Sequence, residues 1–429
     1  MSTPSHAIAA QVREAFTLHM QGQLDAAEPK YRAALEQAPR NFIALHMLGV
    51  LHLQRGQNAE AERFIGKALK IEPKDATALS NRGLALRALQ RFDEALLCFN
   101  KSAAFNPVAA ETHYNRALTL HDLGRYDEAL TAFDRAIILK PDYAEAHAGR
   151  ANALASLSRL DEAVAGFDAA LALHPADTHT LHNRGHALMR LGRYNEACDD
   201  FARAVERQPD FAEAHTGIGE CLLVQGNFAI GWKAYEWRWA ARSLATAQRD
   251  FPAPRWHGDE DITGKTLLLH AEQGFGDTIQ FCRYASVAVA RGAHVVLEVP
   301  AELRALLATI GPSIRVVARG STLPAFDYHA PLLSLPLAFG TDLDSIPAAI
   351  PYVSADPQRV AEWKSRLSGD AALHVGLVWS GRASHLNDRN RSIPLNDLAT
   401  VLKIEDIAFI GLQPEVRPAD QKILTAIPS

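Results

Sequence analysis

The chain has 429 residues, which predicts two or three domains, and its 48% hydrophobic and 22% charged residues are ordinary for a soluble globular protein. The net charge of −5 and the pI of about 6.4 do not favour a general nucleic-acid-binding protein, which would carry a basic patch or stripe. No apolar run approaches the roughly 20 residues that span a bilayer, and Met1 to Ala10 lacks the basic start and apolar core of a secretory signal.

The cysteines are not paired at metal-ligand or redox spacing; they are Cys98, Cys198, Cys221 and Cys282. We expect them to be packing residues, and a reducing cytoplasm is the simplest location for the chain. Two segments, 259–261 and 342–344, match the Asp-x-Asp pattern of metal-dependent transferases, but both are expected in loops. The histidines show no clustered ligand spacing, so neither a metal nor a cofactor is expected.

The first 240 residues repeat with a period of 34, which five series of residues share. A proline ends each unit: Pro39, Pro73, Pro107, Pro141, Pro175 and Pro209. A small residue recurs within each first helix: Ala15, Gly49, Gly83, Ala117, Ala151, Gly185 and Gly219. The remaining series are two alanines and an aromatic, such as Ala129, Phe133 and Ala136. This phase places units at 8–41, 42–75, 76–109, 110–143, 144–177 and 178–211.

Each unit is predicted to be two antiparallel helices, because the small residue lets them approach closely and the proline cannot continue the second helix. The pattern resembles the tetratricopeptide repeat (TPR) closely, which implies an α-solenoid that binds peptides and proteins on its concave surface. After a leader at 1–7, we expect the solenoid over 8–240, with a degenerate seventh unit that ends in Gly231–Trp239. The three tryptophans of this last motif are predicted to dock on the next domain.

An asparagine occupies one position of three units, just before the small residue: Asn81, Asn115 and Asn183. In the O-linked N-acetylglucosamine transferases an asparagine at the matching position grips the substrate backbone, so the resemblance implies a peptide-binding ladder. Other units interrupt it with Arg13, Met47, Gly149 and Gly217. The alternative is that these polar residues are solvated or hydrogen-bonded within the repeats.

The period stops after Arg242, and 241–264 is predicted to be a linker. A first Rossmann-like lobe is expected over 265–355, with strands at 266–271, 294–299 and 314–318 and helices at 278–291 and 301–310. The start of a second lobe is expected over 356–429, with helices at 357–367 and 395–403 and strands at 374–379 and 408–412. Alternating strands and helices of this kind predict parallel sheets.

Two loops that follow strands could carry chemistry. The first contains Gly274, Gly276 and Asp277; it is neither a complete dinucleotide fingerprint nor a phosphate loop, but it places an acid at a helix start and a strand end. Asp277 could instead only cap the helix. The second runs from Ser380 to Ser392, and its small residues and arginines suit a diphosphate, although it could equally be a solvated basic loop.

Both loops, in this order and spacing, resemble bacterial TPR proteins with a C-terminal glycosyltransferase domain. The resemblance covers about 255–429 and includes Glu272–Phe281, Gly376–Gly381 and Asn387–Leu395. That domain is similar to the heptosyltransferases, which have the two-lobed GT-B architecture, and more distantly to the O-linked N-acetylglucosamine transferases. The resemblance implies that Asp277 is the general base. It implies donor-diphosphate contacts from Gly274, Gly276, Ser380, Gly381, Arg389 and Arg391.

The chain departs from this family in its second lobe, where 356–429 holds only about two strands and two helices. The sequence therefore predicts either a truncated chain or lost catalysis. The leading hypothesis is a glycosyltransferase that transfers a sugar from a nucleotide-sugar donor to a protein or envelope-associated acceptor held by the TPR groove. The alternative is a non-catalytic scaffold for protein–protein interaction. Neither nucleic acid nor an integral membrane segment is expected.

Overall fold

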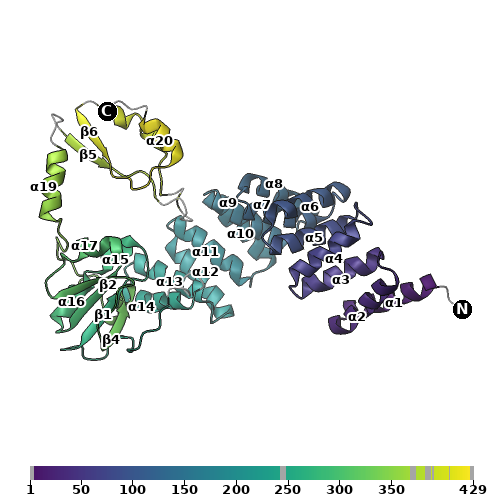
Figure 1. Ribbon diagram of the computed structural model, residues 1–429, viewed down its shortest axis with the longest axis horizontal. Coiled ribbons are helices and arrows are strands. Elements are labelled where there is room, and N and C mark those ends of the chain that lie inside the picture. Colours follow the sequence, from purple (N-terminus) through teal and green to yellow (C-terminus); the bar gives the residue numbers. More distant parts are fainter. Residues whose placement is uncertain are drawn as a thin grey trace.

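The computed structural model describes residues 4–241, 248–367, 373–381, 388, 391–404 and 406–425. Helix pairs stack side by side into a curved array over the first half of the chain (Figure 1). A four-stranded parallel sheet with helices follows the array, and a two-stranded parallel sheet lies near the carboxyl end. Within the described residues, no helix is both long and apolar enough to cross a membrane.

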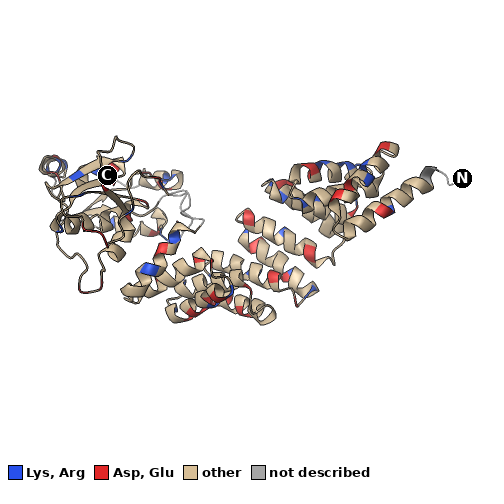
Figure 2. Ribbon diagram, turned by 90° about the horizontal axis from the view of Figure 1, so that it is seen from below, with Lys and Arg blue, Asp and Glu red and all other residues tan. Residues whose placement is uncertain are grey.

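The array consists of α1 to α14, taken in pairs along the chain. Their bounds are α1 Pro4–Met20, α2 Leu24–Gln37, α3 Phe42–Gln54, α4 Asn58–Leu69, α5 Ala76–Ala88, α6 Phe92–Phe105, α7 Ala110–Asp122, α8 Tyr126–Leu139, α9 Ala144–Ser156, α10 Leu160–Leu173, α11 Thr178–Arg190, α12 Tyr194–Arg207, α13 Ala212–Val224 and α14 Phe228–Tyr235. Helix α1 thus begins inside the stretch that the sequence assigns to a leader. Acidic and basic residues both occur along the array (Figure 2).

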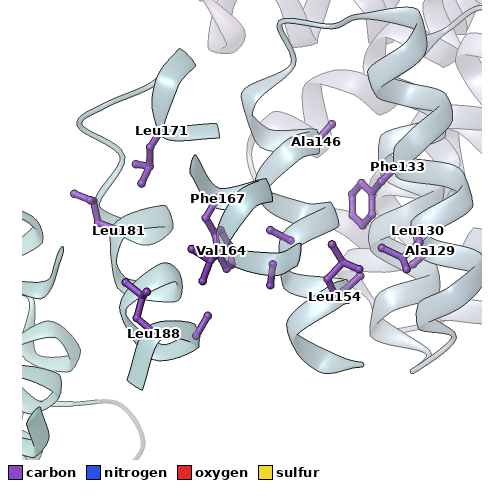
Figure 3. Close-up of a cluster of buried hydrophobic side chains, with 14 of the residues drawn as sticks. Ala129, Leu130, Phe133, Ala146, Leu154, Val164, Phe167, Leu171, Leu181 and Leu188 are labelled. Atoms are coloured by element: carbon purple, nitrogen blue, oxygen red, sulfur yellow. The ribbon is translucent and has the colours of Figure 1, made fainter. Parts of the chain in front are cut away.

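The core of the array is built from the phased residues. Phe133, Phe167 and Phe201 are fully buried, and they belong to one continuous cluster of apolar side chains in the central and last repeats (Figure 3). A Cβ built on Gly185 would lie 2.7 Å from the Phe201 ring, which is closer than real side-chain contacts allow. The predicted close approach of the two helices at the small residue is therefore confirmed at this position.

Two of the residues that interrupt the asparagine series are glycines packed closely against the preceding repeat. A Cβ on Gly149 would lie 2.5 Å from the Phe133 ring, and one on Gly217 would lie 2.7 Å from the Phe201 ring. The aromatic residue of the preceding repeat occupies the space in which an asparagine side chain would begin. Asn115 and Asn183 follow Phe99 and Phe167 at the same spacing, so this packing does not by itself exclude an asparagine.

The turn between the two helices of each unit requires a left-handed residue. Gly56 and Gly124 have φ angles of 70° and 72°, respectively. Gln90 and Ser158 stand at the equivalent positions of two other units, both with φ of 59°. Residues with a Cβ are strained in this region, so these two turns carry a cost that the glycine turns avoid.

The array ends with a seventh helix pair whose second helix is short. After α14 the chain forms a 3-10 turn, η1 Glu236–Trp239. Trp232 meets the ring of Phe281 in the next domain edge to face, at 6.0 Å between ring centroids, and the guanidinium of Arg255 lies over Trp239. Trp237 instead stacks on His215 of the array, with the centroids 4.0 Å apart. Docking on the next domain is confirmed for Trp232 and Trp239 and is wrong for Trp237.

The first lobe is a parallel sheet in the order β3-β2-β1-β4. The strands are β1 Thr266–His270, β2 His294–Val299, β3 Ile314–Ala318 and β4 Tyr328–Pro331. In register, Leu267 of β1 faces Val295 of β2 and Tyr328 of β4. The edge strand β4 was not predicted, because it has four residues, is half polar and ends in Pro331, which an edge position tolerates.

The helices of this lobe are shorter than the sequence suggests. The predicted helix at 278–291 is two helices, α15 Phe275–Phe281 and α16 Tyr284–Ala290, and the predicted helix at 301–310 is a 3-10 turn, η3 Ala301–Leu303, with α17 Arg304–Leu307. A further turn and helix, η4 Leu332–Ser334 and α18 Leu335–Ala338, follow β4. Trp256, from the segment predicted as a linker, is 1% exposed in the core of the lobe.

The C-terminal unit has α19 Pro357–Arg366, the parallel strands β5 Leu373–Leu377 and β6 Ile407–Gly411, and α20 Pro418–Leu424. The helix predicted at 395–403 is wrong, since η6 Leu395–Leu398 and η7 Val401–Lys403 are separate 3-10 turns. Asn396 and Asp397 favour turns, and Thr400 and Val401 are β-branched, so the segment has weak helix propensity. The chain is thus a helical solenoid followed by small parallel-sheet regions.

Candidate functional site

Two adjoining cavities lie in a groove between the odd-numbered helices of the array. The first, of about 260 Å³, is formed by α7, α9 and α11 with Ala170 of α10, and it includes Tyr114, Glu145 and Asp177. The second, of about 520 Å³, is formed by α11 and α13 and includes Asp210 and Glu213. His179 and Asn183 line both cavities, so the two lie next to each other. We call them together the central groove.

The predicted asparagine ladder meets the central groove at one residue. The Nδ2 atom of Asn183 donates to Oδ1 of Asn152, 3.1 Å away, and both side chains line the first cavity. Asn81 and Asn115 line neither cavity. Asn81 lies toward the amino terminus, where its Nδ2 is 3.0 Å from Nε2 of His46. Both contacts join neighbouring repeats, and a role for the three asparagines in gripping peptide stays a prediction.

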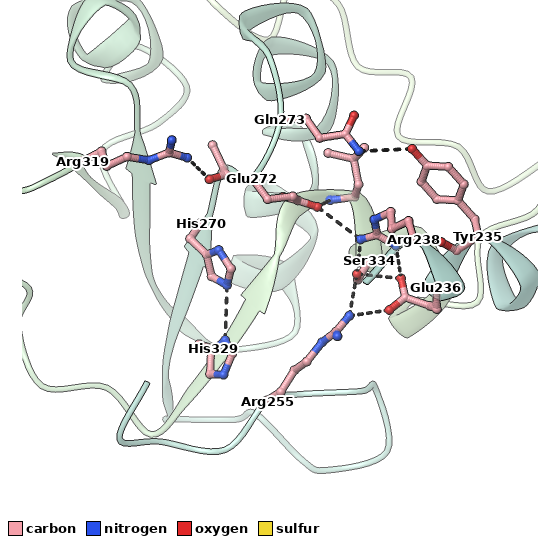
Figure 4. A network of polar contacts seen from close by, with 12 residues as sticks. Tyr235, Glu236, Arg238, Arg255, His270, Glu272, Gln273, Arg319, His329 and Ser334 are labelled. Carbon is pink, nitrogen blue, oxygen red and sulfur yellow. Dashed lines mark hydrogen bonds and ion pairs between the residues drawn. The ribbon is translucent and has the colours of Figure 1, made fainter. Parts of the chain in front are cut away.

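A buried network of charges joins the end of the array to the first lobe (Figure 4). Arg238 is 1% exposed, and its guanidinium donates to Oε1 of Glu236 at 2.6 Å, to Oγ of Ser334 at 2.6 Å and to Oε1 of Glu272 at 3.2 Å. Arg255 also donates to Ser334 and Glu236. Two guanidinium groups thus balance two carboxylates at the junction.

The environment of the network also shifts the pKa of one of its acids, Glu272. Burial raises the pKa of Glu272, while the charge of Arg238 and a hydrogen bond from the backbone N–H of Leu333 oppose that rise. Arg238, Arg255 and Ser334 were not predicted as site residues from the sequence. The Trp-Arg-Trp pattern at 237–239 was the available signal for Arg238, because arginine stacks on aromatic rings and is favoured in buried ion pairs.

The first predicted loop lies next to this junction. Asp277 is in the first turn of α15, where its Oδ2 accepts a hydrogen bond from the backbone N–H of Gly274 at 3.1 Å, so it caps the helix. Gly276 has open space beside it. The Nε2 atom of Gln273 donates to the hydroxyl of Tyr235 at the end of the array, 3.2 Å away. The carboxyl end of β1 therefore adjoins the last helix pair.

The hydroxyl of Tyr235 lies within electrostatic reach of acids from both sides of the junction. Burial raises the pKa of Tyr235, the hydrogen bond from Gln273 and the charge of Arg238 oppose this rise, and the negative charges of Glu220 on α13 and Asp277 on α15 add smaller increases. Burial also raises the pKa of Glu220 itself. The end of the solenoid and the first loop thus place two carboxylates within electrostatic reach of one hydroxyl.

The structure describes only part of the second predicted loop, Ser380 to Ser392. The backbone N–H of Ser380 donates to Oε1 of Gln413 at 3.1 Å, and that of Gly381 donates to Oγ of Ser392 at 2.9 Å. The amides predicted to bind a diphosphate are therefore already bonded within the unit. Arg391 is exposed, and Arg389 lies outside the described residues.

The two Asp-x-Asp segments, 259–261 and 342–344, form local hydrogen bonds within turns. Asp342 accepts hydrogen bonds from the backbone N–H groups of Asp344 and Ser345, at 3.1 and 2.9 Å, as in an ordinary Asx turn. Asp261 accepts from the backbone N–H of Thr263 at 2.9 Å. Among the residues that the structure describes, no group of three or more His, Cys, Asp or Glu side chains is arranged to hold a metal ion.

Comparisons with known proteins concern the array. Tetratricopeptide-repeat models match residues 18–81, 114–178 and 182–229, and a model for subunit 3 of the anaphase-promoting complex, or cyclosome, matches 54–136. Protein FlbA of Caulobacter vibrioides is 26% identical over 223 residues, which are 48% of this chain and 37% of that protein. The chain thus spans little more than a third of the length of this relative.

Two solved structures are similar to about half of this chain. One, a tetratricopeptide repeat protein from Parabacteroides merdae, is 22% identical with a TM-score of 0.46, over 54% of this chain and 91% of that chain. Another, PilF of Pseudomonas aeruginosa, is 18% identical with a TM-score of 0.45, over 50% of this chain and 98% of that chain. The repeat models and the phased helix pairs agree, and the first half of this chain is a tetratricopeptide-repeat solenoid.

Proposed function

We propose that the chain is a protein-interaction scaffold whose solenoid holds an extended segment of a partner protein in the central groove. The observation that carries the proposal is the pair of adjoining cavities along consecutive repeats, with Asn152 and Asn183 among the residues that line them. Amides offer both a donor and an acceptor, which suits the backbone of an extended peptide. Repeat arrays use such elongated surfaces for binding.

The proposal can be tested by selecting peptides from a random phage-displayed library on the immobilised full chain. Affinities of the selected peptides are then measured by fluorescence anisotropy. Ala148 lines the first cavity, so Ala148→Phe should fill it and weaken binding about tenfold or more. The matched control is Ala165→Phe, an exposed position of α10 that lines neither cavity. Equal binding by both variants, or a library without binders, would contradict the groove as the binding site.

A second candidate function is glycosyl transfer by the parallel-sheet part, and one observation favours it. Asp277 stands at the carboxyl end of β1, where open α/β sheets bind ligands, and it adjoins the end of the solenoid through Gln273 and Tyr235. In this mechanism Asp277 takes the proton of the acceptor hydroxyl. The acceptor oxygen bonds to the sugar carbon, and the nucleoside diphosphate leaves with the electrons of the broken bond.

The remaining residues of the glycosyltransferase hypothesis would stabilise that leaving group. They are Gly274, Gly276, Arg389 and Arg391, together with Ser380 and Gly381, whose backbone amides would first have to leave Gln413 and Ser392. The test is release of nucleoside diphosphate from a panel of nucleotide sugars by the full chain, with Asp277→Asn as the variant. Asparagine still caps α15 but cannot accept the proton, so turnover should fall at least a hundredfold. Absence of both donor binding and release in the wild type would end this hypothesis.

A further inference from the structure

A third cavity lies where the end of the array meets the first lobe. Its volume is about 280 Å³, and it is lined by side chains of α13 and α14 on one side and of α15, α16 and the segment 341–346 on the other (Figure 1). We call it the junction cavity. No described residue lines both this cavity and the central groove. Interfaces between domains are common places for small-molecule sites.

Aromatic rings from both domains line the junction cavity. Trp232 of α14 contacts the rings of Phe228 and Phe281, with centroids 6.1 and 6.0 Å apart, respectively. The Phe281 ring in turn stacks on that of Tyr284, with the centroids 6.3 Å apart. Val224 of α13 also lines the cavity, and it is 61% exposed. An apolar group placed here would remove aromatic and aliphatic surface from water, which favours binding.

The junction cavity also contains a positioned arginine. Arg283 donates from Nε to the carbonyl oxygen of Gln280 at 2.9 Å and from Nη1 to that of Pro347 at 2.8 Å. Its guanidinium lies over the ring of Tyr352, 4.7 Å from the centroid. These contacts hold the side chain in place, but its Nη2 atom forms no hydrogen bond or ion pair with any residue that the structure describes. This nitrogen is therefore available to an acceptor on a ligand.

The amide of Gln280 is a second available group. Gln280 lines the cavity beside Arg283, and its exposed side chain makes no hydrogen bond to a described residue. A guanidinium and an amide next to each other can donate to the two oxygens of one carboxylate. The volume of the cavity is at the low end of small-molecule sites, which hold about 300–1,000 Å³, so the ligand that fits is small.

We propose that the junction cavity binds a small organic acid with an apolar body, of the size of a medium-chain fatty acid. The apolar body lies against Phe228, Trp232 and Phe281, and the carboxylate accepts hydrogen bonds from Nη2 of Arg283 and from the amide of Gln280. Aromatic rings alone would also attract a cationic ligand, but the positive charge of Arg283 opposes it. This site is additional to the peptide-binding groove of the proposed scaffold.

The position of the cavity gives binding a consequence for stability. The ligand would contact α14 of the array and α15 of the lobe at once, so it would bind only while the two are docked. A ligand that binds the docked state alone stabilises that state by mass action. The unfolding temperature of the lobe should therefore rise with the concentration of the organic acid.

The test uses the full chain and three ligands that share one alkyl chain, namely octanoate, 1-octanol and octylamine, all below the concentrations at which they form micelles. Isothermal titration calorimetry should show saturable binding of octanoate, binding of octanol about tenfold weaker, and no binding of octylamine, because only the carboxylate pairs with Arg283. Octanoate should also raise the unfolding temperature of the lobe in calorimetric scans.

Two variants separate the apolar and the charged parts of the site. Val224→Trp should fill the cavity and weaken octanoate and octanol alike, about tenfold or more; its control is Ile230→Trp, an exposed position of α14 outside the lining. Arg283→Gln should weaken octanoate about tenfold and leave octanol unchanged. Its control is Arg304→Gln, an exposed position of α17 that does not line the cavity.

Each contrary outcome overturns a stated part of the proposal. If octanoate does not bind, or if Val224→Trp binds it as tightly as Ile230→Trp does, the junction cavity is not the site. If octanol binds as tightly as octanoate, or if Arg283→Gln weakens both ligands equally, recognition of the carboxylate is wrong. Neither result bears on peptide binding in the central groove, because no described residue lines both sites.

Discussion

The solenoid and the first lobe are stabilised by contacts of different range. In the solenoid each helix packs on its neighbours in the chain, and Phe133, Phe167 and Phe201 repeat one contact every 34 residues. In the lobe, the central strand β1 pairs on one side with β2 and on the other with β4, which is much later in the sequence. A change in the solenoid should therefore act on adjacent repeats, whereas a change in the lobe should act on the whole sheet.

The largest expected effect comes from the residue that joins the two regions. Arg238→Met removes the guanidinium from the junction and leaves Glu272 and Glu236 with fewer partners. Breaking a buried ion pair by removing one partner costs about 3–5 kcal/mol. Calorimetry should then show the lobe unfolding in a separate transition, at a lower temperature than the solenoid.

The control for this prediction is Arg193→Met. Arg193 pairs with Glu196 one helical turn away at an exposed position, so its loss should leave the unfolding temperature nearly unchanged. A single transition in Arg238→Met at the wild-type temperature would show that the buried network does not couple the two regions.

Acid should destabilise the lobe through His270. This side chain is 5% exposed, and burial lowers its pKa from 6.5 to about 3, so it stays neutral in the folded lobe while the unfolded chain takes up a proton below pH 6.5. Its contribution to stability is therefore complete above pH 6.5 and is lost as the pH falls toward 3. Between pH 7 and pH 5 we expect a loss of about 2 kcal/mol from this residue.

Urea unfolding at pH 7 and pH 5 measures this loss, and His270→Phe should reduce it by the same amount. Phenylalanine is a reasonable substitute because the His270 ring packs on Phe251, with the centroids 4.9 Å apart. His294→Phe, at an exposed position at the start of β2, is the control. If His270→Phe and the wild type lost equal stability, His270 would not be the titrating group.

Two glycine substitutions should test whether a change in one repeat of the solenoid affects only the adjacent repeats. Gly185→Ala would push a Cβ to 2.7 Å from the Phe201 ring and should destabilise the array by about 1–3 kcal/mol. Gly66→Ala, within α4, would meet its nearest neighbour at 3.8 Å and should stabilise by about 0.5–1 kcal/mol. Hydrogen exchange should show each change confined to the adjacent repeats. Effects of the same sign, or a change in protection of the β1 amides, would contradict this account.

The smallest expected effect on stability comes from a substitution in a turn between the two helices of one repeat. Gln90 has φ of 59°, where glycine is unstrained, so Gln90→Gly should stabilise the solenoid by about 0.5–1 kcal/mol. The reciprocal change, Gly56→Gln, has no neighbour within 4 Å of its Cβ and should destabilise by backbone strain alone. Shifts of the urea midpoint in opposite directions would support this reading, and unchanged midpoints would refute it.

The range of contacts also explains which parts of the fold the sequence predicted. A period of 34 reports contacts between neighbours, so it placed the helix pairs and the close approach at Gly185. Strand β4 and buried Trp256 depend on partners that no local pattern indicates, namely β1 and the backbone carbonyl of His329. The split at Cys282 also escaped detection, because α15 and α16 continue the same apolar pattern.

Among the candidate site residues too, those placed by local pattern could be predicted from the sequence and those placed by long-range contacts could not. The position of Asp277 at a helix start and strand end followed from the strand-loop-helix order, but its place beside Tyr235 depends on docking of the solenoid. Hydrogen bonds between Arg238 and Ser334 connect residues 96 positions apart, so no spacing rule could find them. The acids of the central groove come from turns and helix starts of different repeats, and only the stacking of those repeats brings them together.

The buried network at Arg238 also has a mechanical consequence. Bending the solenoid away from the lobe would pull Arg238 from Glu272 and Ser334, at a cost several times the thermal energy. The last repeat and the lobe are therefore expected to move as one rigid unit. A force applied to the amino-terminal repeats would reach the sheet through this unit, next to the loop that carries Asp277.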